Sequence, residues 1–171
     1  CVFQVEGISI GLLICEDAWF DEPGHLAKDA GAELLAVINA SPYHVGKGGE
    51  RIERMRQGAL ATGLPLIYAH NVGAQDEVVF DGASFVLGAD GALAGSAPSF
   101  VEDLFFFEAN RALVSAKPAQ AAIEIVAKIT PERSNEAQLW DALVLGVRDY
   151  VTKNGFPSTL LGLSGGIDSA L

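Results

Sequence analysis

Three short apolar runs, separated by segments of helical pattern, constrain the fold of this chain most strongly. Residues 8–14, 34–38 and 66–69 are almost continuously apolar, without the polar alternation of a half-exposed strand. Such runs are typical of strands covered on both faces, as in a parallel sheet flanked by helices. We therefore predict an α/β fold, with helices at about 25–30 and 50–62 connecting the strands.

Glycine-containing turns predict that antiparallel strands extend this sheet. The pairs at 6–7 and 81–82 and the triplet at 89–91 each place Gly after a residue suited to a tight turn. Turns of this composition favour hairpins, so the sheet is expected to be mixed. A last strand of this part is predicted at 104–107.

The last third of the chain predicts a connector followed by the start of a second unit. Residues 110–133 mix Ala, Lys and Pro, and we expect them to lie on the surface as a connector. Asn135 and Gln138 have the spacing of a capping box at the start of a helix. A strand is predicted at 158–163, followed by a helix from about Ile167.

Composition and charge exclude several classes of function. Half of the residues are apolar and 19% are charged, as in folded globular proteins. A net charge of −11 argues against nucleic acid as a partner, because phosphate binding needs clustered Lys and Arg. No signal peptide and no membrane-spanning apolar run are present, so no membrane partner is expected. Cys1 and Cys15 are too few for a disulfide framework or a zinc site, and a cytoplasmic location is expected.

The ends of the chain predict that it is a piece of a longer protein. It has no initiator Met, it begins close to a predicted strand, and it stops just inside a predicted helix.

Cys15 lies where the first buried strand is predicted to end. A side chain at such an exit projects from the rim of the sheet while the strand fixes its backbone. The backbone N–H of Glu16 would point at the same place and could stabilise an oxyanion. A nucleophilic thiol is one interpretation, although position in a strand alone favours a small buried hydrophobe.

The sequence Ile-Cys-Glu-Asp-x-Trp around Cys15 resembles the nucleophile segment of the nitrilase, or carbon–nitrogen hydrolase, superfamily. The resemblance implies a Glu–Lys–Cys triad, in which Cys15 attacks a carboxamide and forms an acyl-thioester. It also implies that residues 1–112 are the C-terminal half of a nitrilase-like α-β-β-α sandwich. The family's Glu and Lys precede its Cys, upstream of residue 1 here, so this chain alone is expected to be inactive.

A second segment, Asn-Ala-Ser-Pro-Tyr-His at 39–44, resembles the substrate loop of glutaminases in that superfamily. The resemblance implies that Ser41 and Lys47 bind the α-amino and α-carboxylate groups of glutamine. A Lys suits a carboxylate as a mobile point charge, whereas the alternative for Lys47 is a solvated loop residue. No functional role is expected for the histidines, His25, His44 and His70.

A glycine turn near the end of the chain has the features of an anion site. Glycines let the backbone approach a phosphate, and a helix start offers unpaired N–H groups. The turn lacks the Lys of the common NTPase loop. Its Ser-Gly-Gly-x-Asp-Ser sequence resembles the pyrophosphate loop of N-type ATP pyrophosphatases, which implies ATP binding by Gly162, Leu163, Ser164, Gly165, Gly166, Ile167, Asp168 and Ser169. Mg²⁺ is expected on the phosphates, with Asp168 as its one candidate ligand.

The order of these motifs resembles the glutamine-dependent NAD synthetase family. That resemblance implies a glutaminase part at 1–112, a connector at 113–133, and at 134–171 the first helix and strand of a doubly wound α/β ATP-pyrophosphatase domain. The implied reaction is amidation of deamido-NAD to NAD with ATP and ammonia from glutamine. Glutamine, ATP with Mg²⁺ and deamido-NAD are the implied partners, in a homo-oligomer without a tightly bound organic cofactor.

Two alternatives remain open from the sequence. The chain could belong to a stand-alone carbon–nitrogen hydrolase, an amidase, in which the C-terminal glycine turn is incidental. It could also be a non-catalytic scaffold or an oligomer interface.

Overall fold

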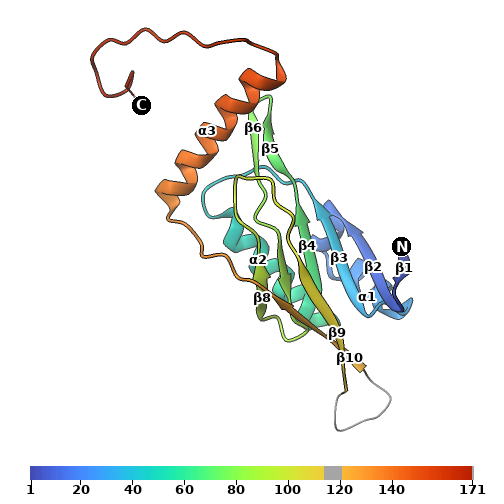
Figure 1. Cartoon of the computed structure of the whole chain (residues 1–171). Coiled ribbons are helices and arrows are strands. Elements are labelled where there is room, and N and C mark those ends of the chain that lie inside the picture. The colour runs from blue at the N-terminus through green and yellow to red at the C-terminus, as the bar shows by residue number, and fades with distance from the viewer. Residues whose placement is uncertain (114–120, 171) are drawn as a thin grey trace.

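The computed structural model describes residues 1–113 and 121–170, and it places a six-stranded mixed sheet at the centre of the chain (Figure 1). The sheet order is β1-β2-β3-β4-β7-β8. Strands β2, β3 and β4 are parallel, and the remaining neighbours are antiparallel, which confirms the predicted mixed α/β sheet. The strands are β1 (Val2–Val5), β2 (Ile8–Ile14), β3 (Leu34–Asn39), β4 (Leu66–His70), β7 (Phe85–Leu87) and β8 (Leu93–Ser96).

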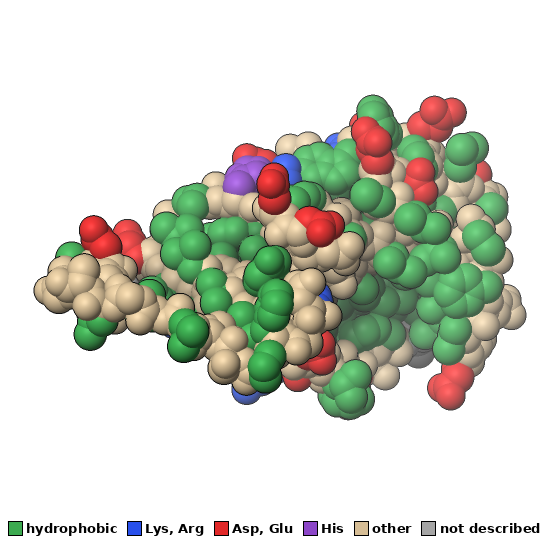
Figure 2. Space-filling model, turned by 90° about the horizontal axis from the view of Figure 1, so that it is seen from above, with side chains coloured by type: hydrophobic (Ala, Val, Ile, Leu, Met, Phe, Trp, Pro, Cys, Tyr) green, Lys and Arg blue, Asp and Glu red, His purple; other side chains and the backbone are tan. Residues whose placement is uncertain are grey.

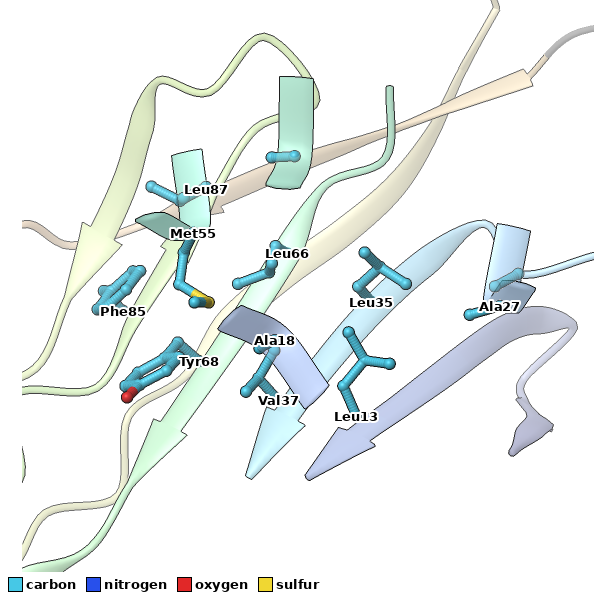
Figure 3. Close-up of a cluster of buried hydrophobic side chains, with 12 residues drawn as sticks. Leu13, Ala18, Ala27, Leu35, Val37, Met55, Leu66, Tyr68, Phe85 and Leu87 are labelled. Carbon is cyan, nitrogen blue, oxygen red and sulfur yellow. The ribbon is translucent and has the colours of Figure 1, made fainter. Parts of the chain in front are cut away.

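Two helices connect the parallel strands and pack on one face of the sheet. They are α1 (Asp21–Asp29) and α2 (Lys47–Thr62). Figure 3 shows the core that they enclose, in which Met55 of α2 points toward side chains of β4 and β7. Both helices begin earlier than predicted, and α1 includes Pro23 in its first turn, where the N–H that Pro lacks would have no intrahelical partner. Helix α2 ends at Thr62 as predicted, and Gly63 caps it with a φ of 65°.

The opposite face of the sheet is covered by a hairpin in the segment predicted to be a surface connector. Strands β9 (Phe107–Leu113) and β10 (Ala121–Ala127) pair antiparallel, so the last strand does not run from 104 to 107 as predicted. Ile123 and Ile125 are buried against Leu34 and Val86. The alternation Ile123-Glu124-Ile125 is the signal of a strand with one buried face, and the mixed composition around it obscured that signal.

A second hairpin rises from the sheet between β4 and β7. It joins β5 (Val72–Gln75) to β6 (Val78–Asp81), so the turn lies at residues 76–77 and not at the predicted 81–82. Gly82 instead redirects the chain toward β7, with a φ of 65° and its N–H donated to Asn71. The strand β5 is short and contains Gly and Gln, which hid it from the sequence pattern.

Helix α3 (Asn135–Lys153) packs on this second hairpin (Figure 1). Its cap is Ser134, whose hydroxyl accepts from the N–H of Ala137, and not the predicted Asn135–Gln138 box. The carboxylate of Asp149 accepts from the N–H of Ala74 at 2.8 Å. Lys153 donates to the Ala74 carbonyl at 2.7 Å. Within the described residues, no helix combines the length and the apolar composition needed to cross a bilayer.

The segment after α3 leads away from the sheet without regular structure (Figure 1). The strand predicted at 158–163 and the helix predicted from Ile167 are both absent from the described residues. Leu160 is fully exposed. A strand needs a hydrogen-bonded neighbour, and none of the described strands lies beside this segment. Of the second unit expected from the sequence, its first helix is therefore present and its strand is not formed.

Candidate active site

Cys15 stands at the sharp turn where β2 ends. It begins a short 3-10 helix, η1 (Cys15–Trp19), and its side chain is exposed, as the prediction of a thiol at the sheet rim requires. Its φ of 51° lies in the left-handed region, which is uncommon and strained for a residue other than Gly. The Asp17 carboxylate stabilises the turn by accepting from the N–H of Ile14 at 3.0 Å.

The parallel strands bring Cys15 and the predicted substrate loop to the same edge of the sheet. Ile14 is paired with Ile38, and β2 and β3 therefore end side by side, one residue before Cys15 and shortly before Ser41. The carboxyl ends of parallel strands are where ligand sites form in open α/β sheets. Figure 2 views the molecule from above this edge and shows that hydrophobic side chains gather on that side.

Lys47 links the start of α2 to the turn that carries Cys15. Its Nζ lies 4.6 Å from the ring centroid of Trp19, the last residue of η1, in a cation–π contact. The same nitrogen is 3.0 Å from the Glu50 carboxylate. The hydrogen bond and the charge of Lys47 lower the pKa of that exposed carboxyl. Lys47 is 20% exposed and helical, so it is held in place rather than being a solvated loop residue.

Ser41 is held by His70, a residue for which the sequence predicted no role. The Ser41 N–H donates to Nε2 of His70 at 3.1 Å, and the Ser41 hydroxyl lies 3.3 Å from the same nitrogen. His70 is the last residue of β4, and its side chain is fully buried. His70 directly follows the apolar run 66–69, but no local motif distinguishes it from a surface histidine in the sequence.

His70 belongs to a buried polar network. Arg51 of α2 places Nη1 at 3.1 Å from Nδ1 and 3.2 Å from Nε2 of His70, and its Nη2 contacts both oxygens of Asp81 at 2.6 and 2.7 Å. The Tyr68 ring stacks on His70 with 5.7 Å between centroids. The Tyr68 hydroxyl is 2.6 Å from the amide nitrogen of Asn39, which donates to it. All five residues are buried.

This network keeps the imidazole of His70 neutral. Burial, followed by the positive charge of Arg51, lowers the pKa of His70 to about 4, and the Asp81 carboxylate opposes that shift only in part. A neutral ring keeps one nitrogen lone pair, which is the acceptor that the Ser41 N–H needs.

The lowered pKa of His70 predicts a specific pH dependence of stability. An unfolded His binds a proton at about pH 6.5, whereas the folded one does so only near pH 4, so the folded state is favoured in full above pH 6.5. As the pH falls from 6.5 to 4, protonation of His70 in the unfolded state should lower the free energy of unfolding by on the order of 3 kcal/mol. Urea unfolding of the complete gene product should show a smaller decrease in the free energy of unfolding between pH 6.5 and 4 for His70→Gln than for the wild type. Equal pH slopes for the two proteins would contradict the buried neutral His.

The predicted ATP loop forms a compact turn apart from the Cys15 edge (Figure 1). The hydroxyls of Ser164 and Ser169 are 2.9 Å apart, and that of Ser169 also accepts from the Ser164 N–H at 3.2 Å. Gly165 has a φ of 86°, a conformation that suits Gly alone. The loop is mostly exposed, and no group of three or more metal-binding side chains occurs around Asp168 or elsewhere in the described part of the chain.

Two known protein families match two different segments of the chain. The profile of the carbon–nitrogen hydrolase family matches residues 1–119. The chain belongs to the carbon–nitrogen hydrolase family. A second profile, that of NAD synthase, matches residues 139–171, which cover most of α3 and the glycine turn.

Relatives of this carbon–nitrogen hydrolase chain include glutamine-dependent NAD(+) synthetases. The enzyme of Xylella fastidiosa strain Temecula1 is 43% identical over 171 residues, which cover all of this chain and 30% of the relative. The enzyme of Acinetobacter baylyi is 38% identical over 170 residues, again 30% of its length. The chain thus spans about 30% of the length of the curated relatives that it matches.

Solved structures agree with the nitrilase-like fold. The glutamine-dependent NAD+ synthetase of Acinetobacter baumannii in complex with ADP superposes with a TM-score of 0.84 at 37% identity, over 99% of this chain and 31% of that one. An amidase of the nitrilase superfamily from Nesterenkonia has a TM-score of 0.51 at 29% identity, over 57% of this chain and 37% of that one.

Proposed function

We propose that this chain is the segment of a glutamine-dependent NAD synthetase that carries the glutaminase nucleophile and the first part of the ATP site. The observation that carries the proposal is an exposed Cys15 at the sheet edge that also holds Ser41 and Lys47. The relatives that match the whole chain, across both profile matches, are named as synthetases of this kind and support the same conclusion.

The geometry supports nucleophilic release of ammonia from glutamine. The Cys15 sulfur attacks the carboxamide carbon, and the backbone N–H of Glu16 donates to the oxygen as negative charge develops there. The C–N bond then breaks, the leaving nitrogen takes the proton given up by the thiol and departs as ammonia, and water cleaves the thioester to give glutamate and the free thiol. The proposed mechanism also uses the Glu and Lys of the family's triad, which the resemblance places before the nucleophile in sequence.

Binding of the substrate follows from the charges at the same edge. The ammonium group of Lys47 attracts the α-carboxylate of glutamine, and the Ser41 hydroxyl accepts a hydrogen bond from its α-amino group. The contacts of Lys47 with Trp19 and Glu50 hold it near the nucleophile, and they support this assignment over that of a solvated lysine.

The glycine turn supports binding of the ATP phosphates. Backbone N–H groups from Ser164 to Ser169 and the two serine hydroxyls are donors that suit phosphate oxygens. One carboxylate, that of Asp168, fits Mg²⁺, since this ion is usually held by one or two carboxylates together with phosphates. When bound, Mg²⁺ would neutralise phosphate charge, and the residues of the turn orient the chain of phosphates.

The proposed second reaction activates a carboxylate for attack by ammonia. The free carboxylate of deamido-NAD is a poor electrophile and has to be activated. One of its oxygens attacks the α-phosphorus of ATP and releases pyrophosphate, which leaves the carboxyl group bound to AMP. Ammonia then attacks the acyl carbon, AMP leaves, and the amide of NAD is formed. We propose the boundaries 1–112, 113–133 and 134–171 for the glutaminase part, connector and synthetase part, in a cytoplasmic homo-oligomer.

Trapping of an acyl-enzyme tests this proposal. The complete gene product, incubated with glutamine and quenched in acid, should carry one γ-glutamyl group on the peptide that contains Cys15, as detected by mass spectrometry. The peptide with Cys1, also exposed, is the internal control and should stay unmodified. Consumption of glutamine without an adduct on Cys15 would contradict the proposed nucleophile. Release of ammonia without any ATP-dependent formation of NAD would favour a stand-alone amidase.

A further inference from the structure

The backbone of Ser41 leaves the sheet at a point where no strand can pair with it. Strand β3 ends at Asn39, whose carbonyl accepts from the N–H of Asn71 just beyond the end of β4. Two residues later the N–H of Ser41 has passed the last register pair of β3 and β4, Asn39 with His70. The ring nitrogen of His70 accepts from that N–H and replaces the carbonyl that a longer β4 would have offered.

The loop is fixed a second time at Tyr43. The N–H of Tyr43 donates to the carbonyl of Val79 in β6 at 2.7 Å. Its ring meets Phe100 edge to face, with 5.1 Å between centroids. Strand β6 therefore holds this part of the loop and, two residues after Val79, also supplies Asp81 to the buried network.

The buried charges of this network are not needed to fill the space, and burying them is unfavourable because they lose their hydration. A buried ion pair is often no more stabilising than apolar side chains of similar volume, because both charges lose their hydration. Arg51 and Asp81 are 2% and 5% exposed in their side chains, and both face His70. What this pair provides beyond packing is a fixed orientation and a fixed charge state of the imidazole.

We infer that His70, oriented by Arg51 and Asp81, is a positioning residue that holds Ser41 in the geometry needed to bind glutamine. This inference rests on the proposed function. The single lone pair of Nε2 accepts from the Ser41 N–H, and the Ser41 hydroxyl oxygen lies 3.3 Å from this nitrogen, which then carries no hydrogen to donate to it. The oxygen lone pairs of the hydroxyl then remain free for the α-amino group of the substrate. Without the ring acceptor, the loop loses one of its two anchors.

Two substitutions at His70 separate positioning from packing. His70→Leu fills a similar volume but offers no acceptor, whereas His70→Gln can place its amide oxygen near the position of Nε2. In the complete gene product, His70→Leu should raise KM for glutamine about tenfold or more, with a much smaller change in kcat. His70→Gln should restore KM to within a few-fold of the wild type. His25→Leu, at an exposed position on α1, is the matched control and should leave KM unchanged.

Ammonia-driven formation of NAD and exchange of the Ser41 amide complete the test. His70→Leu should leave ammonia-driven synthesis unchanged, and hydrogen exchange at Ser41 should become faster in His70→Leu but not in His70→Gln. An unchanged KM for His70→Leu, or equal losses in His70→Leu and His70→Gln, would overturn the inference. Absence of any glutamine-driven activity in the wild-type protein would instead overturn the proposed function, so the two failures can be distinguished.

Discussion

Replacing Cys15 with alanine is expected to abolish glutamine-driven synthesis of NAD while leaving ammonia-driven synthesis intact. This change removes the thiol on which the proposed acyl intermediate forms, at the turn where the parallel strand β2 ends. The loss of the glutamine-driven rate should be on the order of 10³-fold or more, as for removal of other catalytic nucleophiles. The measurement is the initial rate of NAD formation by the complete gene product, with glutamine or with an ammonium salt as nitrogen donor.

The matched control for this change is Cys1→Ala. Cys1 is the other free cysteine and is also exposed; it precedes the edge strand β1, and its carbonyl accepts from the N–H of Leu12, three residues before Cys15. Both rates should stay at wild-type level in Cys1→Ala. If Cys15→Ala reduced the two rates equally, the thiol would be supporting the structure of the whole protein rather than releasing ammonia from glutamine.

The parts of the fold that could be predicted are those whose signal is local in the sequence. Strands β2, β3 and β4 contribute to the core clusters on both faces of the sheet, although Ile14 and Ile38 near their ends are exposed, and their continuous apolar runs predicted their positions within a residue or two. Strand β10 was missed because only one of its faces is buried, by Ile123 and Ile125, within a segment of mixed composition. The strand predicted at 158–163 has the right composition, but a strand also needs a neighbour, which composition cannot supply.

The residues of the candidate site also divide into those that a local motif predicts and those that only the folded chain brings together. Cys15, Ser41 and Lys47 were predicted from motifs, because each lies in a short segment with a specific order of residues. His70, Arg51 and Asp81 carry no such signal, and they come together only because β4, α2 and β6 meet in the folded chain. Arg51 in particular belongs to a helix segment rich in charged residues, Glu-Arg-Ile-Glu-Arg, which predicts an exposed side chain. Its burial is a property of tertiary structure alone.

Arg51→Met is expected to lower the free energy of unfolding of this region by about 3–5 kcal/mol. Methionine can fill much of the volume of arginine, but it leaves the Asp81 carboxylate buried without the two contacts of 2.6 and 2.7 Å. Hydrogen exchange of the amides of β4 in the complete gene product measures this local free energy directly. Arg54→Met is the matched control on the same helix, because its partner Asp21 is 63% exposed and stays hydrated, so a loss below about 1 kcal/mol is expected.

A double variant shows whether the lost stability comes from the unpaired charge. Arg51→Met combined with Asp81→Leu removes both ions, and it should recover most of the stability lost in Arg51→Met, since an apolar pair can fill such a site without desolvated charge. The recovered protein should still bind glutamine weakly, because the ring of His70 would have lost both of the groups that orient it. Equal destabilisation by Arg51→Met and Arg54→Met would show that Asp81 does not depend on its buried partner. Full recovery of both stability and glutamine binding would show that the ion pair does not position the site.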